Sequence, residues 1–160
     1  MKNYKLIWLG IFCCLQPIIL FAQRGETIRK AFLDPKSDQV LVVAHRGNWR
    51  SAPENAVAAI DSAIQMGVDI VEIDIHKTKD GQLILMHDDR VDRTTNGKGL
   101  IKDYTLAEIK KLKLKDKDGN LTEHIVPTLE EALLAGKGQI MFNLDKAYSV
   151  FDEVYAVLEK

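Results

Sequence analysis

The sequence predicts an α/β fold with a largely parallel sheet, and three observations support this prediction. Apolar runs of strand length alternate with segments of helical periodicity from Val40 to Leu158, a pattern typical of parallel strands joined by crossover helices. The first run, residues 39–45, is almost continuously apolar, as expected of a strand buried on both faces. The link between the second and third strands is too short for a crossover, so we expect one hairpin.

Local signals fix the elements in order. Gly67 stops the first helix, Asp80-Gly81 forms a tight turn, and Thr128 caps a helix that follows Pro127. A long polar loop covers residues 89–99. The expected strands span residues 39–45, 68–75, 82–88 and 139–145, and the expected helices span residues 55–66, 106–114, 127–135 and 150–158.

Residues 1–22 form a separate segment with a basic start, an apolar middle and a small residue at its end. This pattern predicts a secretory signal peptide cleaved before Gln23, and hence export to the periplasm or to the outside of the cell. A transmembrane anchor is the alternative, but Gln16 and Pro17 interrupt an apolar run that is already short for a bilayer span.

Both cysteines lie within this segment, and Phe12 precedes Cys13, where a lipid-modified cysteine would need a small neighbour. We therefore expect no lipid anchor, no disulfide and no stable membrane attachment after cleavage. The net charge of −1 and the pI of about 6.4 give no reason to expect nucleic acid as a partner. Residues 23–38 form a polar lead-in, and residues 39–160 carry the fold.

Two carboxylates share one face of the second strand. Because side chains alternate along a strand, Glu72 and Asp74 point to one side and Val71, Ile73 and Ile75 to the other. The two acidic residues are roughly 6.5–7 Å apart at the backbone, so both can reach one oxygen-ligated cation. The alternative is the solvated face of an edge strand. It is less favoured, because Asp is depleted in strands and two enclosed anions would repel each other without a cation.

Two of the expected strands end in histidine. A single His45 or His87 would more often be structural or simply exposed, but two of them beside a carboxylate pair suit hydrolysis. In such chemistry one imidazole takes a proton while the other gives one. A hairpin centred near Asp80 would place His87 roughly opposite Glu72.

Arg46 and Gly47 directly follow His45. The guanidinium is a planar fork that matches a phosphate group, and glycine lets the backbone approach a ligand closely. The junction after the first strand therefore indicates phosphate chemistry.

In order and spacing, these residues resemble the glycerophosphodiester phosphodiesterase family. The likeness covers about residues 40–146 and rests on the motifs in combination. The motifs are His45-Arg46-Gly47, Pro53-Glu54-Asn55, Glu72-x-Asp74, Thr78-Lys79-Asp80-Gly81, His87-Asp88, Asp92-Arg93-Thr94-Thr95 and Pro127-Thr128-Leu129-Glu130-Glu131.

The resemblance implies a TIM barrel that hydrolyses glycerophosphodiesters to an alcohol and glycerol 3-phosphate with a divalent cation, Ca²⁺ or Mg²⁺. By this resemblance His45 and His87 form the acid–base pair, without a division of the two roles between them. It also implies that Arg46 binds the phosphate and that Glu72 and Asp74 are metal ligands.

A later strand departs from the family pattern of Asn-aliphatic-Glu-aliphatic-Lys, because this chain has Asn-Leu-Asp-Lys at residues 143–146. The resemblance makes Asp145 the third carboxylate ligand, with a shorter reach than Glu. Lys146 arrives one position early, so strand alternation predicts that it points to the opposite face. Glu54 and Asn55 are expected to support the ion or its loop from outside the ligand set, although Pro-Glu-Asn is also a plausible helix start.

The length limits how much of a barrel the chain can form. A TIM barrel takes about 200–250 residues, whereas this sequence has 160 residues and four expected strands instead of eight. We therefore expect the N-terminal half of a barrel, with an open edge through which copies could self-associate. The alternative function is a truncated or degenerate module that binds metal and phosphate without turnover. A glycosidase ranks last, because its two carboxylates would leave both histidines unexplained.

Overall fold

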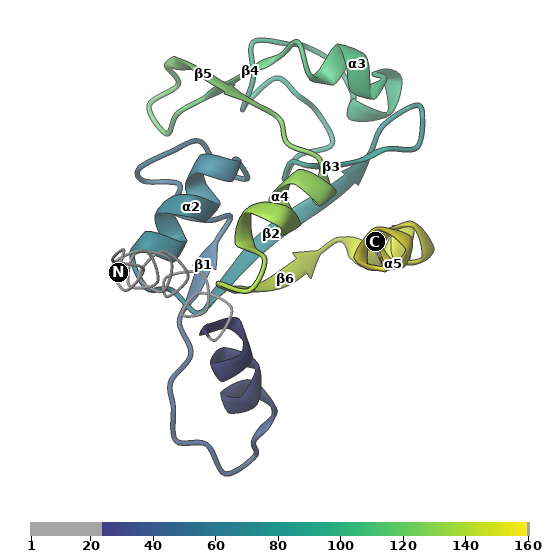
Figure 1. Ribbon diagram of the computed structural model, residues 1–160. Coiled ribbons are helices and arrows are strands. Elements are labelled where there is room, and N and C mark those ends of the chain that lie inside the picture. The colour runs from purple at the N-terminus through teal and green to yellow at the C-terminus, as the bar shows by residue number, and fades with distance from the viewer. Residues whose placement is uncertain (1–23, 160) are drawn as a thin grey trace, which may run out of the picture.

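The computed structural model describes residues 24–159 and shows an α/β arrangement around one small sheet (Figure 1). Strand β2 (Ile70–Lys77) is central. It pairs in parallel with β1 (Val43–His45) and with β6 (Met141–Asp145), and antiparallel with β3 (Leu83–Leu85). The predicted α/β class and the predicted hairpin are therefore confirmed. Within the described residues the sheet does not close into a barrel.

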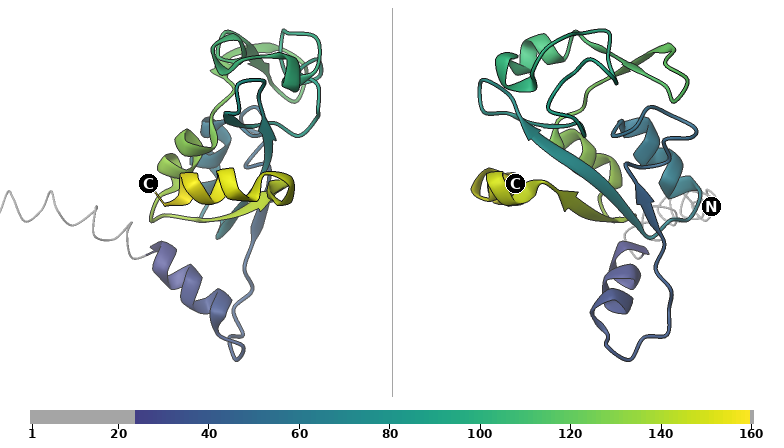
Figure 2. Two further views of the ribbon diagram at one scale, coloured as in Figure 1. Left: turned by 90° about the vertical axis from the view of Figure 1, so that its right-hand side faces the viewer. Right: turned by 180° about the vertical axis from the view of Figure 1, so that it is seen from behind.

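Helices α2 (Val57–Gln65) and α4 (Leu129–Gly136) pack side by side against one face of the sheet (Figures 1 and 2). Their apolar side chains meet the apolar face of β2 in the main core, to which α5 (Phe151–Leu158) adds Val154. Thr128 begins α4 with a capping box, as the sequence predicts, because its hydroxyl accepts from the Glu131 N–H while the Glu131 carboxylate accepts from the Thr128 N–H. The core side chains include Ile60, Ala63, Val71, Ile73, Ile75, Leu129 and Ala132.

The opposite face of β2 carries the acidic residues. Glu72 and Asp74 are both buried, at 8% and 1% exposure, beneath the loop that follows β1 rather than beneath a helix. The alternation predicted for this strand is thus confirmed.

The expected strand over residues 39–45 is mostly wrong. Only Val43–His45 is strand, and Val40, Val42 and Val43 are exposed. The physical reason is that β1 pairs only with β2 among the described residues, so its other edge and much of its side-chain surface lie open. An apolar run alone cannot report whether a second neighbour is present.

The expected helix over residues 106–114 is correct only at its start. Helix α3 (Leu106–Ile109) follows a capping box at Thr105 and Glu108, and the chain then forms an antiparallel hairpin of β4 (Lys113–Lys115) and β5 (Leu121–Ile125). Leu114 lies in a second apolar cluster together with Ile84, Val91 and Ile109. This cluster forms the core of the small lobe that lies above the sheet in Figure 1. The chain also contains two short 3₁₀ helices, η1 (Ile101–Asp103) and η2 (Ala147–Val150).

The hairpin is centred on Asp80, as predicted. Ile75 pairs with Leu85 and His76 with Ile84, so the same register continued past the end of β3 places His87 one position away from the residue opposite Glu72. A one-residue slip moves a side chain to the other face of a strand, and turn geometry decides the register. His87 lies beyond the end of β3, in the loop that follows.

The polar lead-in contains a helix over residues 24–33. Ile28 is buried, and the Arg24 guanidinium donates to the carbonyl oxygens of Gln139 and Val68 below the sheet. The predicted signal peptide lies outside the described residues. Across residues 24–159, no helix combines the length and apolarity needed to span a bilayer.

Candidate metal and phosphate site

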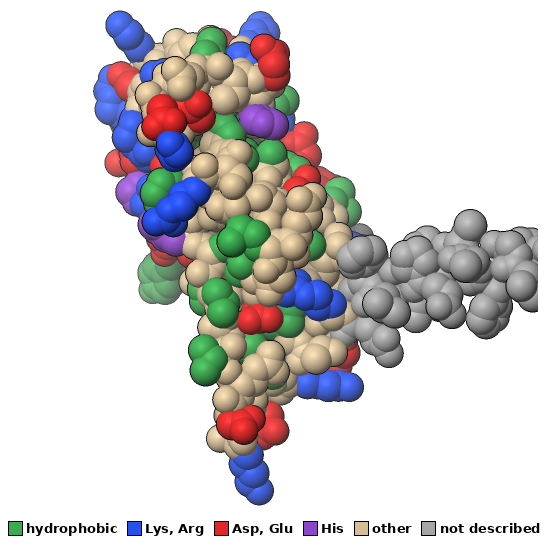
Figure 3. Space-filling model, turned by 90° about the vertical axis from the view of Figure 1, so that its left-hand side faces the viewer, with side chains coloured by type: hydrophobic (Ala, Val, Ile, Leu, Met, Phe, Trp, Pro, Cys, Tyr) green, Lys and Arg blue, Asp and Glu red, His purple; other side chains and the backbone are tan. Residues whose placement is uncertain are grey.

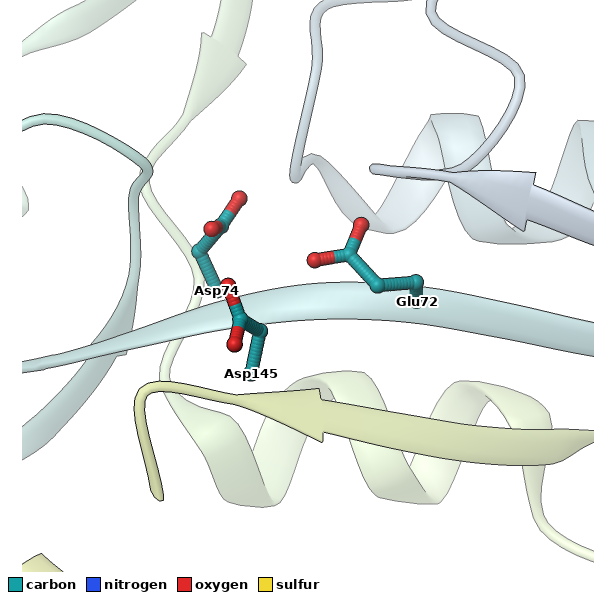
Figure 4. Close-up of side chains that lie close together, drawn as sticks. All are labelled: Glu72, Asp74 and Asp145. Atoms are coloured by element: carbon teal, nitrogen blue, oxygen red, sulfur yellow. The ribbon is translucent and has the colours of Figure 1, made fainter. Parts of the chain in front are cut away.

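Three carboxylates gather on the helix-free face of the sheet. Glu72 and Asp74 project from β2, and Asp145 projects toward them from the end of β6 (Figure 4). The β2–β6 register pairs Asp74 directly with Asp145. One oxygen from each of the three side chains lies within 4.8 Å of the others.

Asn55 holds Asp74 in place by a reciprocal pair of hydrogen bonds. The Asn55 Nδ2 donates to Asp74 Oδ2 over 2.9 Å, and the Asp74 N–H donates to Asn55 Oδ1 over 3.1 Å. Asn55 is 2% exposed and adopts a left-handed backbone with φ of 59°, which Asn tolerates better than most residues. The other carboxylate oxygen, Asp74 Oδ1, is buried and makes no hydrogen bond within the described residues.

The electrostatics of this cluster favour a bound positive charge. Burial raises the pKa of Glu72; the hydrogen bond from the Arg46 N–H opposes this rise, and the negative charges of Asp74 and Asp145 add to it. Three carboxylates, one of which has a buried oxygen without a hydrogen bond, fit an oxygen-ligated divalent cation. Without such a cation, the mutual repulsion of the carboxylates is only partly offset by Arg46 and Lys146.

The end of β1 delivers Arg46 and His45 to the same place. The Arg46 N–H donates to Glu72 Oε2 over 2.8 Å, its Nη1 donates to Glu54 over 3.1 Å, and its Nε lies 3.5 Å from Asp74 Oδ2. Arg46 and Gly47 both have positive φ, and a Cβ at Gly47 would come within 2.8 Å of the Ala59 Cβ. Glycine is therefore required here to bring this turn against α2. The His45 ring is mostly exposed, with its Nε2 3.9 Å from Glu72.

His87 is held by a chain of charged groups. Its Nδ1 lies 2.6 Å from Asp88 Oδ1, Arg93 bonds both Asp88 and Glu54 in bidentate fashion, and Glu54 reaches Arg46. The hydrogen bond from Arg93 holds the pKa of Asp88 well below its usual range. Burial acts in the opposite direction, and the hydrogen bond with His87 lowers the pKa further. An ionised carboxylate can only accept, so Nδ1 carries a proton, and in the neutral imidazole Nε2 is the acceptor.

Glu54 is charged for a related reason. Burial would raise its pKa, but the hydrogen bonds and charges of Arg93 and Arg46 outweigh that effect and lower it. This residue therefore links the arginine of the first loop to the arginine of the loop after β3.

The prediction for Lys146 is wrong. The strand ends at Asp145, and Lys146 turns into a left-handed conformation with φ of 61° and ψ of 7°. Strand alternation no longer applies, so the side chain returns to the acidic face. Its Nζ lies 3.4 Å from Asp74 Oδ1 and donates to the carbonyl oxygen of His87, which also contacts the His76 Nε2 over 3.2 Å.

The structure thus brings the predicted residues into one network. Glu72, Asp74 and Asp145 form its centre, while Arg46 and Asn55 bond it directly. The His45 ring is linked to this network through Glu72. His87 is linked to it in two ways: its carbonyl oxygen accepts from Lys146, and its ring leads through Asp88, Arg93 and Glu54 to Arg46. Asp88 and Arg93 received no role from sequence reasoning, although they lie within matching motifs and Asp88 directly follows His87.

Fold and site together define an α/β protein with a candidate cation and phosphate site at the carboxyl ends of its parallel strands. The family model described as the glycerophosphoryl diester phosphodiesterase family matches residues 45–160. The chain belongs to this family.

Similar proteins agree. A glycerophosphodiester phosphodiesterase of Caldanaerobacter subterraneus is 45% identical over 109 residues, which cover 67% of this chain and 45% of the relative. Human glycerophosphodiester phosphodiesterase 1 is 42% identical over 102 residues, which cover 60% of this chain and 30% of the relative. The chain therefore spans less than half the length of these relatives.

Solved structures show the same likeness. An Oleispira antarctica phosphodiesterase in complex with the product sn-glycerol-3-phosphate matches with a TM-score of 0.68 at 34% identity, over 76% of this chain and 52% of that one. A glycerophosphoryl diester phosphodiesterase from Parabacteroides distasonis matches with a TM-score of 0.73 at 29% identity, over 84% and 49%.

Proposed function

We propose that this chain carries the catalytic groups of a metal-dependent glycerophosphodiester phosphodiesterase, which releases an alcohol and glycerol 3-phosphate. The observation that carries the proposal is a three-carboxylate cluster with the Arg46 guanidinium against it, which Glu54 and Arg93 link to the Asp88-bound His87. Family membership supports the same reaction class.

Glu72, Asp74 and Asp145 would hold the divalent cation, Ca²⁺ or Mg²⁺. When bound, the cation supplies Lewis-acid polarisation of the phosphoryl oxygens. Asn55 keeps one oxygen of Asp74 occupied and leaves Oδ1 for the ion.

Arg46 binds and orients the phosphate. Its Nη1 is occupied by Glu54, while Nη2 makes no hydrogen bond within the described residues and is free to donate to a phosphoryl oxygen. A guanidinium placed there offsets charge that develops in the transition state. Glu54 sets the direction of the fork and does not touch the substrate in this scheme.

His87 acts as the base in this proposal, because the proton on Nδ1 is held by Asp88 and the lone pair on Nε2 is free. It accepts a proton from the attacking hydroxyl, which belongs either to water or to the 2-position of the glycerol. His45 gives a proton to the departing alcohol. The His45 ring, at the end of β1, lies 3.9 Å from Glu72, whereas His87 lies in the loop after β3, where its carbonyl oxygen accepts from Lys146.

The test is release of choline from glycerophosphocholine by the purified chain, with Ca²⁺ or Mg²⁺ and then with a chelator. We expect turnover that the chelator abolishes and that added cation restores. His45→Ala should lose at least about 100-fold in kcat, whereas His124→Ala, a matched change on the exposed strand β5, should leave turnover unchanged. Release that survives chelation, or that responds equally to both changes, would contradict the proposal.

A second candidate is a module that binds cation and phosphate without turnover. The observation that favours it is that Arg46 contacts Glu72 and Asp74 of the carboxylate cluster directly, without either imidazole ring between them. Cation binding by calorimetry, lost in Glu72→Gln, combined with no hydrolysis under any condition, would establish this second candidate over the first.

We propose that the sheet is the first half of a TIM barrel. Edge strand β1, with exposed Val43, would then offer an unpaired edge for self-association. The N-terminal segment supports a further proposal, export after cleavage at residue 22, which a size shift of the secreted product would test.

A further inference from the structure

The main chain of His87 lies just outside the strand that precedes it. Strand β3 ends at Leu85, and the next residue, Met86, still donates its N–H to the carbonyl oxygen of Asp74 over 3.1 Å. His87 follows directly, where the ladder of β2 and β3 no longer continues. A catalytic side chain is only as precisely placed as the contacts that support it, so the contacts of the His87 main chain matter for the proposed base.

The carbonyl oxygen of His87 receives two side-chain donors. The His76 Nε2 lies 3.2 Å from it, and the Lys146 ammonium donates to it as well. A carbonyl oxygen has two lone pairs and can only accept, so both lone pairs are engaged and the His76 Nε2 carries a proton. The main chain at His87 is therefore held from β2 and from the turn after β6.

His76 is the more rigid of these two donors. It stands on the central strand β2, where its backbone pairs with Ile84, and its side chain is only 18% exposed. Strand alternation places it on the same face as Asp74. Lys146, in contrast, reaches the carbonyl oxygen on a flexible stem of four carbons. Its ammonium is also shared, because it lies 3.4 Å from Asp74 Oδ1.

The other surroundings of His76 do not account for its placement. Asp89 Oδ1 lies 3.7 Å from Nε2, which is too long for a hydrogen bond, and the Asp89 side chain is 85% exposed. The ring borders two cavities, both of which Asp89 and Lys77 also line. Replacing the ring therefore removes little packing from the apolar core.

We propose that His76 is a positioning residue for the base. Its Nε2–H fixes the main chain of His87, and thereby the imidazole, relative to the carboxylate cluster. The inference rests on the proposed function for the role of His87. It goes beyond that function by assigning a task to a histidine that contacts neither substrate nor cation in the scheme above.

Two substitutions separate the donor from the bulk of the ring. In His76→Gln the amide nitrogen can take the place of Nε2 and still donate, whereas in His76→Leu the side chain fills space without a donor. The matched control is His124→Leu on the exposed strand β5. Asp89→Asn tests the neighbouring carboxylate.

Amide hydrogen exchange measures the hold on the main chain without any turnover. The Met86 N–H reports on the end of β3, and the Ile60 N–H, which donates to Ala56, reports on α2 and the core. In His76→Leu we expect the Met86 amide to exchange at least about fivefold faster, because a neighbouring hydrogen bond is lost, with Ile60 unchanged. His76→Gln and both controls should leave the two amides unchanged.

Three results of the exchange measurement would overturn the inference. The first is no acceleration at Met86 in His76→Leu. The second is equal acceleration at Met86 and Ile60, which would mean that His76 only stabilises the fold as a whole. The third is acceleration of the same size in His76→Gln, which would mean that the ring and not the donor is required.

Hydrolysis of glycerophosphocholine at saturating cation is the second measurement. His76→Leu should lower kcat by about tenfold or more with KM unchanged, because the base is displaced while the substrate contacts remain. His76→Gln should keep kcat within about threefold of the unsubstituted chain, and His124→Leu should leave it unchanged.

The two measurements together distinguish this inference from the proposed function. An unchanged kcat in His76→Leu, or a raised KM in its place, overturns the positioning role and leaves the phosphodiesterase intact. Faster exchange at Met86 without turnover in the unsubstituted chain supports the hold of His76 on the main chain and contradicts the proposed activity.

Discussion

The two histidines of the candidate site differ in how firmly the fold holds them. The His45 side chain is 64% exposed, and its Nε2 lies 3.9 Å from the Glu72 carboxylate. The His87 side chain is 38% exposed, with Asp88 at 2.6 Å and Arg93 behind it. The two exposures follow from where the residues lie in the fold. His45 ends an edge strand, whereas His87 lies in a loop that two arginine–carboxylate pairs hold in place.

This difference shows where the site is preorganised by the described residues themselves. Figure 3 shows basic and acidic side chains gathered on the upper part of one face, the part to which β4 and β5 belong. Asp88 and Arg93, in the loop after β3, supply the paired charges that orient His87, whereas His45 has only Glu72 at 3.9 Å. A functional difference between the two sides should therefore be measurable.

The largest expected effect is the loss of His87 orientation in Asp88→Asn. An amide in place of the carboxylate can bind either tautomer, so kcat should fall by about 100-fold or more with little change in KM. The control is Asp89→Asn, an exposed neighbour that lies 3.7 Å from His76. A rise in KM with unchanged kcat would show that Asp88 serves substrate binding instead of orientation.

A smaller effect is expected at Lys146, on the far side of the carboxylate cluster. Removing its ammonium in Lys146→Gln takes a competing positive charge away from Asp74, so the cluster should bind Ca²⁺ about fivefold more tightly by calorimetry. Lys137→Gln, at the end of α4, is the control and should leave affinity unchanged. Weaker binding in Lys146→Gln would mean that the lysine supports the carboxylates rather than competing with the cation.

The Arg93 network should also make the stability of the fold depend on pH. The folded-state pKa of Asp88 is lowered, so its contribution is present above the unfolded value of about 3.9 and is lost as pH falls below it. Arg93→Gln should cost on the order of 1 kcal/mol of unfolding free energy at pH 7, after allowance for solvent exposure, and less at pH 3. Urea unfolding at both values measures this, with Arg90→Gln as the control; an equal cost at both would exclude the ionic origin.

Local signals in the sequence predict the centre of this molecule well. Alternation in β2 gives the shared face of Glu72 and Asp74, and the capping signal at Thr128 gives the start of α4. Both depend on neighbours within a few residues, where sterics and hydrogen bonding determine the outcome.

Other features depend on tertiary contacts that periodicity does not report. The open side of β1 reflects that it pairs only with β2 among the described residues, and β4 forms because Leu114 joins a distant apolar cluster. The position of the Lys146 side chain depends on a single residue with positive φ at the end of β6. Asp88 and Arg93 lie in motifs that the sequence analysis identifies, but the ion pair between them depends on how the loop folds, which the sequence pattern does not predict.

The smallest expected effect lies at the exposed edge beside His45. Val43 is 51% exposed on β1, so Val43→Lys should change the free energy of unfolding by less than about 0.5 kcal/mol. A lysine on an open edge opposes pairing with another strand, and sedimentation should therefore show less self-association than in the unsubstituted chain. Met66→Lys, a change at a still more exposed site at the end of α2, should leave association unaltered. If both changes reduce association alike, general charge and not the edge of β1 governs it, and the contrast between a completed His87 side and an open His45 side loses its structural basis.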